Sequence, residues 1–108
     1  MNVAMHLNNL GIRTAFISKV GQDDLGKELI DFVNSRNLDT QWIQEDTTQP
    51  TGIVHVNMDD TTEVTYEIVQ PVAWDFIETT PALISLTKDS GAFVYETLAA
   101  RHETSRQT

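Results

Sequence analysis

The segment TAFISKVGQDDLG (residues 14–26) predicts a buried strand, a tight loop and the start of a helix. Its first part, Thr14–Val20, has the apolar centre typical of a strand that is covered on both faces. In the loop that follows, Asp23 or Asp24 is placed to cap the free N–H groups of a helix, where negative charge is also favourable. Apolar residues then recur at helical spacing, at Leu25, Leu29, Phe32 and Val33. This order of elements is typical of a layered α/β domain.

The flanking sequence adds two helices and a second strand. Residues 2–10 predict a short helix with one apolar stripe, and Gly11 follows where a left-handed residue ends a helix. Further along, Pro81 interrupts a weakly helical stretch between residues 77 and 86, and Ala92–Tyr95 has the apolar composition of a buried strand. Because two parallel strands cannot cover these helices, we expect the chain to be part of a larger α/β fold.

A β-hairpin is predicted between residues 53 and 68. Apolar and polar side chains alternate in both strands, and the apolar positions are Val54, Val56, Met58, Val64, Tyr66 and Ile68. The sequence Asp59–Thr62 between the strands has the composition of a turn. Since two strands alone are marginally stable in water, we expect the hairpin to lie on another element or to pair with another chain.

Composition excludes several classes of protein. The chain has 108 residues, 16 acidic against 7 basic side chains, a net charge of −9 and no cysteine. Such an acidic chain is not expected to bind nucleic acid, because that binding depends on neutralising phosphates with Lys and Arg. It has no apolar run near the ~20 residues that a membrane span needs, and no signal peptide is evident, so a cytoplasmic location is expected.

Few residues carry an obvious chemistry. The three histidines are far apart in sequence, and neither a metal motif nor a hydrolase motif is present. Glu96 follows the predicted strand Ala92–Tyr95, at the carboxyl end where open α/β sheets place ligand groups, although it is equally an exposed loop residue. Asn2 is either a helix cap or a binding residue, and Arg101 either holds an anionic group or is solvated.

Several motifs, taken together, have the order and spacing of a known signature. They are Asn2-Val3-Ala4 with Gly11 and Gly21, then Gly21-Gln22-Asp23-Asp24-Leu25-Gly26-Lys27, Pro50-Thr51-Gly52, Gln70-Pro71-Val72-Ala73-Trp74-Asp75 and Leu98-Ala99-Ala100-Arg101. In this order they resemble the N-terminal half of the ribokinase-like (PfkB) carbohydrate kinases, and most of all the fructokinases. The resemblance covers nearly the whole chain, which begins too late to contain the Gly-Gly pair that precedes the asparagine in the family.

The resemblance implies a ribokinase-like three-layer α/β/α fold with a small β-hairpin lid. Residues 1–50 would form the first part of the substrate-side α/β domain, residues 51–70 the lid, and residues 71–108 the return to the α/β domain. The family transfers the γ-phosphate of ATP to a sugar hydroxyl, usually with Mg²⁺. Its catalytic aspartate, Gly-rich anion hole and nucleotide pocket lie in the C-terminal half, which is missing here. The chain alone is therefore expected to hold no catalytic residue or metal site, to bind neither ATP nor Mg²⁺, and to be inactive.

The resemblance also assigns substrate contacts. Asn2 matches an asparagine that binds sugar hydroxyls, which suits an amide because it both donates and accepts hydrogen bonds. Glu96 matches a sugar-binding glutamate of ribokinase-type members, whereas fructokinases more often have Gly-Ser, so Glu96-Thr97 departs from their pattern. Arg101 matches an arginine near the substrate in some relatives. The lid would close over the sugar and exclude water, with an apolar underside formed by Val54, Val56, Tyr66 and Ile68.

Two alternatives remain open. The chain is either the substrate-side part of a fructokinase-like enzyme or a non-catalytic interaction module that forms a homodimer through its lid. Within the kinase interpretation, Glu96 favours ribose or a nucleoside over fructose.

Overall fold

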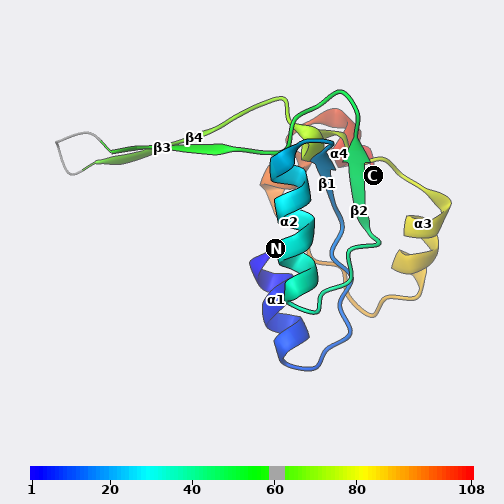
Figure 1. Ribbon diagram of the computed structural model, residues 1–108. Coiled ribbons are helices and arrows are strands. Elements are labelled where there is room, and N and C mark those ends of the chain that lie inside the picture. The colour runs from blue at the N-terminus through cyan, green and yellow to red at the C-terminus, as the bar shows by residue number, and fades with distance from the viewer. Residues whose placement is uncertain (59–62) are drawn as a thin grey trace.

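The computed structural model describes residues 1–58 and 63–108 (Figure 1). The predicted turn at Asp59–Thr62 lies outside the described residues. Along the chain the elements are α1 (Asn2–Asn9), β1 (Ser18–Gly21), α2 (Asp24–Ser35), β2 (Ile43–Asp46), β3 (Val54–Met58), β4 (Val64–Ile68), the 3₁₀ turn η1 (Ala73–Phe76), α3 (Pro81–Lys88), the 3₁₀ turn η2 (Thr97–Ala100) and α4 (Glu103–Gln107).

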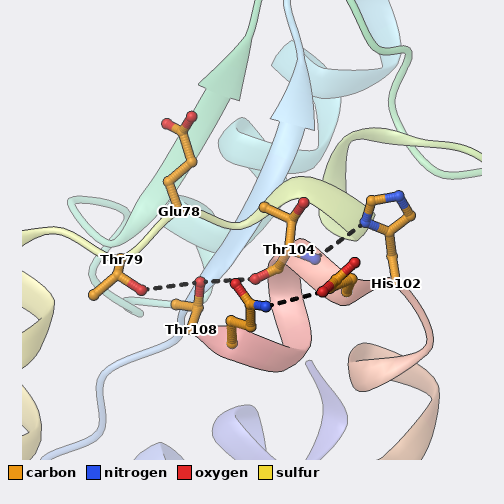
Figure 2. A pocket seen from close by; sticks show the side chains of 7 residues that line it. Glu78, Thr79, His102, Thr104 and Thr108 are labelled. Atoms are coloured by element: carbon orange, nitrogen blue, oxygen red, sulfur yellow. Dashed lines mark hydrogen bonds between the residues drawn. The ribbon is translucent and has the colours of Figure 1, made fainter.

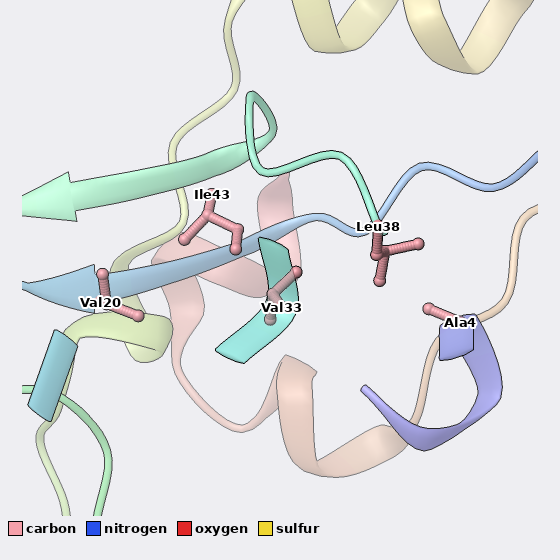
Figure 3. Packing of buried hydrophobic residues seen from close by; sticks show 5 residues of the cluster. All are labelled: Ala4, Val20, Val33, Leu38 and Ile43. Carbon is pink, nitrogen blue, oxygen red and sulfur yellow. The ribbon is translucent and has the colours of Figure 1, made fainter. Parts of the chain in front are cut away.

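A small parallel sheet and two helices form the core. Strands β1 and β2 pair in parallel, from Ser18 opposite Ile43 to Gly21 opposite Asp46. Figure 3 shows the buried side chains that join the sheet to α1 and α2, namely Ala4, Val20, Val33, Leu38 and Ile43. Val33 and Val20 are almost fully enclosed, with exposed fractions of 0% and 2%. This cluster fixes the amino-terminal half of the chain by apolar burial.

The ends of α1 and α2 form as their sequences predict. Gly11 has a φ of 78°, its N–H donates to the carbonyl of Asn8 at 3.0 Å, and the N–H of Ile12 donates to Leu7 at 3.0 Å. This pair of bonds is a Schellman motif, which satisfies carbonyls at a helix end. Asp23 caps α2 by accepting from the N–H of Gly26 at 2.8 Å. Both predictions are confirmed.

Three predictions about regular structure were wrong. Strand β1 begins at Ser18 rather than Thr14, because its partner β2 provides only four paired residues. Ala92–Tyr95 belongs to neither sheet of the described chain and is exposed, with Phe93, Val94 and Tyr95 each more than 60% accessible. Pro81 begins α3 rather than interrupting a helix, and Thr80 caps that helix through the N–H of Leu83 at 3.2 Å. Proline is favourable there because the first helical N–H has no partner to lose.

The hairpin forms with the predicted alternation. Strands β3 and β4 are antiparallel, and the register places the apolar pairs on one face, namely Val54 opposite Ile68, Val56 opposite Tyr66 and Met58 opposite Val64. All of these side chains are exposed. Figure 1 shows the hairpin extending away from the rest of the chain. Within the described residues the hairpin therefore packs on no other element, so the first of the two expected arrangements, packing on another part of the same chain, is not found.

Candidate functional site

Asp23 joins the segment that leads into β3 to the start of α2. Besides capping Gly26, its carboxylate accepts from the backbone N–H of Thr51 at 2.8 Å and from the Thr51 hydroxyl at 2.5 Å. The same hydroxyl accepts from the N–H of Gly21 at the end of β1, at 2.9 Å. Hydrogen bonds from Thr51 and Gly26 lower the pKa of Asp23 below its usual value. The segment that leads into the hairpin is therefore bonded to both α2 and the sheet.

Arg101 holds the other end of the hairpin. Its Nε donates to Asp75 Oδ1 at 2.6 Å, and its Nη2 donates to Asp75 Oδ2 at 2.7 Å and to the carbonyl of Val69 at 2.8 Å. Asp75 is 1% exposed and also accepts from the N–H of Val72. A further bond, from the N–H of Ala73 to the carbonyl of Pro50 at 2.8 Å, ties together the two segments that flank the hairpin.

The predicted substrate-binding residues lie on α1 and η2. Asn2 is the first residue of α1 and is exposed, and Met1 rather than Asn2 occupies the capping position. Glu96 is exposed and precedes η2, while Arg101 follows η2 and is half-buried. Across the described chain no hydrogen bond or ion pair joins any two of these three side chains. Glu96 and Arg101 are linked only through the single turn of η2.

The predicted lid residues Val54, Val56, Tyr66 and Ile68 lie on one face of the hairpin, as their register requires. The opposite face carries His55 opposite Glu67 and Asn57 opposite Thr65. One face of the hairpin is therefore apolar and the other polar. An apolar face of this kind can contact the carbon skeleton of a small ligand or the same face of a second chain.

A buried ion pair between Lys19 of β1 and Asp46 at the carboxyl end of β2 was not predicted. Lys19 Nζ lies 3.1 Å from Asp46 Oδ2 and donates to the carbonyl of Phe76 at 3.0 Å. Asp46 Oδ1 accepts from the N–H groups of Thr48 and Gln49 and from the Thr48 hydroxyl, each at 2.9 Å. Strand β2 was only weakly indicated by the sequence, because β2 contains only one strongly apolar residue, Ile43. The pair borders a polar hollow of about 520 Å³.

A second hollow, of about 380 Å³, lies beside α4. Figure 2 shows its lining side chains, which include Glu78, Thr79, His102, Thr104 and Thr108. Many of their polar atoms bond to one another, as the Thr79 and Thr108 hydroxyls do at 3.2 Å, and His102 Nδ1 accepts from the N–H of Thr104. None of the predicted substrate residues lines this hollow.

Among the described residues, no side-chain cluster suits Mg²⁺, and the Gly21–Gly26 loop does not suit the phosphates of ATP. Over residues 1–58 and 63–108, no group of three or more His, Asp or Glu side chains is arranged to hold a metal ion. The Gly21–Gly26 loop does not suit a phosphate either, because Asp23 already accepts from the Gly26 N–H and both Asp23 and Asp24 repel an anion. We therefore assign no chemical step through either group to these residues. In the described part of the chain, no helix has the length and apolar character to span a membrane.

The described residues thus form a small α/β core from which a β-hairpin projects. Residues 1–95 match the pfkB family carbohydrate kinases, so the chain belongs to that family and has its ribokinase-like α/β fold.

Two relatives illustrate the match. An uncharacterized sugar kinase from Pyrococcus horikoshii is 42% identical over 57 residues, which is 53% of this chain and 18% of that protein. The 5-dehydro-2-deoxygluconokinase of Clostridium botulinum is 40% identical over 43 residues, which is 40% of this chain and 13% of the relative.

Solved structures resemble the whole chain. The structure of the Pyrococcus horikoshii sugar kinase superposes with a TM-score of 0.83 and 27% identity, covering 98% of this chain and 34% of that one. The fructokinase of Halothermothrix orenii superposes with a TM-score of 0.81 and 24% identity, covering 98% of this chain and 37% of its own, which shows the shared fold. The present chain thus spans about a third of the length of these structures.

Proposed function

We propose that this chain forms the sugar-binding part and the lid of an ATP-dependent carbohydrate kinase, in which the γ-phosphate of ATP is transferred to a sugar hydroxyl with Mg²⁺. The observation that carries the proposal is the family match over residues 1–95. ATP as the donor is supported by a homologous sugar kinase whose structure was determined in complex with ATP. The groups that stabilise the transferring phosphoryl group would lie outside these 108 residues.

Within this proposal, residues 1–50 and 71–108 form the substrate-side domain and residues 51–70 form the lid. Asn2 and Glu96 contact sugar hydroxyls. Both side chains are exposed, and neither forms a hydrogen bond with another side chain among the described residues. The amide of Asn2 and the carboxylate of Glu96 are therefore available to a ligand. The apolar face of the lid covers the sugar and keeps water, a competing phosphoryl acceptor, away from the reacting phosphate.

Glu96 favours ribose or a nucleoside over fructose as the substrate. A carboxylate accepts hydrogen bonds from two neighbouring hydroxyls, which suits the sugar-binding role that the resemblance to ribokinase-type members implies for Glu96. A fructokinase-like activity is supported by the overall pattern, since fructokinases are among the structural relatives. A nucleoside kinase also shares the fold, so a nucleoside is the second substrate class to test.

An NMR titration of the ¹⁵N-labelled chain tests sugar binding without requiring phosphoryl transfer. We expect D-fructose or D-ribose to shift the amide signals around Asn2, Glu96 and the lid. Asn2→Ala and Glu96→Gln should each weaken that affinity about tenfold, the effect of losing hydrogen bonds to a polar ligand.

Asn9→Ala and Glu28→Gln are the matched controls, because Asn9 is an exposed amide at the other end of α1 and Glu28 is an exposed carboxylate on α2. Both should leave the affinity unchanged. If fructose, ribose and inosine all leave these amide signals in place, the proposed sugar site is wrong. Selective shifts with inosine would instead assign the site to a nucleoside.

As an alternative to covering the sugar, the same exposed apolar row supports a homodimer formed lid to lid. Six large apolar side chains on one face of a hairpin are exposed, and pairing two such faces would remove them from water. Val56→Lys places a charge in this face and should weaken association at least about tenfold in sedimentation equilibrium.

His55→Lys, one position earlier on the same strand, adds the same charge to the opposite face and should leave association unchanged. A chain that stays monomeric at every concentration, or an equal effect of both variants, would remove the lid from the interface.

A further inference from the structure

The ion pair between Arg101 and Asp75 lies at the exit of the lid, and we name Arg101, Trp74, Asp75 and the Val69 carbonyl the exit latch. The guanidinium makes two parallel bonds to the Asp75 carboxylate, at 2.6 and 2.7 Å. Such bidentate pairs fix orientation as well as distance, because both groups are planar. The same Nη2 donates to the carbonyl of Val69, the residue that follows β4. Arg101 therefore holds the backbone at the point where the hairpin rejoins the α/β domain.

Asp75 gives the latch a buried acidic anchor. It is 1% exposed, which by itself opposes ionisation, but bonds from Arg101 and the N–H of Val72 more than compensate and lower its pKa. Asp75 also lies on η1, which contacts β1 of the core. The latch is thus attached to the sheet rather than to the lid alone.

Trp74 extends the latch to the entry of the lid. The Arg101 guanidinium carbon lies 4.0 Å from the centre of the indole ring. On the entry side, a Cβ built on Gly52 would lie 2.4 Å from Trp74 Nε1, so the indole packs directly on the Gly52 backbone. The Trp74 indole therefore contacts Gly52 before the hairpin, and the Arg101 guanidinium, which lies over that indole, contacts the Val69 carbonyl after it.

We propose that Arg101 is a positioning residue that sets the angle of the lid through Asp75 and Trp74, rather than a residue that contacts the sugar. Two of its guanidinium nitrogens, Nε and Nη2, already donate hydrogen bonds to Asp75 and to the Val69 carbonyl. Because η2 directly joins Glu96 to Arg101, a ligand contact at Glu96 and the root of the lid are coupled through a single turn. The coupling between Glu96 and the root of the lid rests on the proposed sugar site, whereas the role of Arg101 in the latch does not.

Hydrogen exchange of the full chain tests the latch. The probes are the N–H groups of Val69 and Ala73, which bond across the lid root to Ile53 and Pro50. Arg101→Lys keeps the charge but cannot reproduce the planar fork, so we expect these two amides to exchange about tenfold faster while the interior of α2 is unchanged. In a Trp42→Phe background, where Trp74 is the sole indole, its emission should shift to longer wavelength. Arg106→Ala, an exposed arginine on α4, is the control and should change neither signal.

Each result decides between the roles of Arg101. Equal acceleration at the lid root and in α2, or no acceleration at the root, overturns the latch. Loss of sugar affinity in Arg101→Lys with unchanged exchange at Val69 and Ala73 also overturns it, because Arg101 would then bind the sugar directly. Faster exchange at the root in a chain that binds no sugar supports the latch and refutes the proposed sugar site instead.

Discussion

Replacing Gly26 with alanine is expected to lower the free energy of unfolding by about 3 kcal/mol or more, at or above the upper end of what overpacking costs. A Cβ at this position would lie 2.1 Å from the carbonyl oxygen of Gly21 and 2.9 Å from the Thr51 hydroxyl. The first of these atoms is backbone, held in the β1–β2 register opposite Asp46, so it cannot rotate away. Either α2 or β1 must move, and either movement is expected to strain the bonds between Asp23 and Thr51.

Urea unfolding followed by circular dichroism measures the effect. Gly91→Ala is the matched control, because a Cβ there meets nothing within 4 Å and Gly91 has no positive φ. It should change the free energy of unfolding by less than about 0.5 kcal/mol. Equal urea midpoints for Gly26→Ala and Gly91→Ala would contradict the close contact between α2 and β1.

Replacing Asp46 with alanine is expected to lower the free energy of unfolding by about 3 kcal/mol, because it leaves Lys19 buried without its partner. Lys19 is 6% exposed, and its remaining contacts are the Phe76 carbonyl and the exposed Glu78 carboxylate at 3.8 Å. Lys19→Met should cost less, about 1–2 kcal/mol, since Asp46 keeps three hydrogen-bond donors from Thr48 and Gln49.

The same carboxylate makes stability depend on pH. Hydrogen bonds from the backbone of Thr48 and Gln49, with a smaller contribution from Lys19, hold the pKa of Asp46 well below its usual value. A lowered folded pKa contributes stability above the unfolded pKa, about 3.9, and that stability is lost as the pH falls toward the folded pKa. We expect the wild-type chain to lose stability below about pH 4, and the Asp46→Ala variant to lose distinctly less.

Urea midpoints at neutral pH and at about pH 3 test this difference. Asp31→Ala, an exposed acid on α2, is the control and should keep the acid sensitivity of the wild type. An Asp46→Ala variant that is as acid-sensitive as the wild type would mean that Asp46 is not the group that titrates.

The chain's local elements were largely predictable from sequence. Gly11 ends α1 and Asp23 caps α2 because both depend on residues a few positions apart. The faces of the hairpin follow from strict alternation, which fixes the partner of Val56 as soon as the register is known. The motif order also identified the family, which the match over residues 1–95 confirms.

The pairing of distant segments was not predictable. Strand β2 has almost no apolar pattern and exists because it lies beside β1, whereas Ala92–Tyr95 has a strong pattern and forms no strand in the described chain. A strand needs a partner as well as a composition, and the identity of the partner is not a local property.

The sequence by itself determined where helices begin and end, which residues share a face, and which family the chain belongs to, since these depend on neighbours along the chain and on motif spacing. Only the tertiary structure decided what Arg101, Asp75, Lys19 and Asp46 do. Each of these charges is held by a partner more than 25 residues away, Asp75 with Arg101 and Lys19 with Asp46. Burial makes such pairs strong and specific, and burial exists only after the chain has folded.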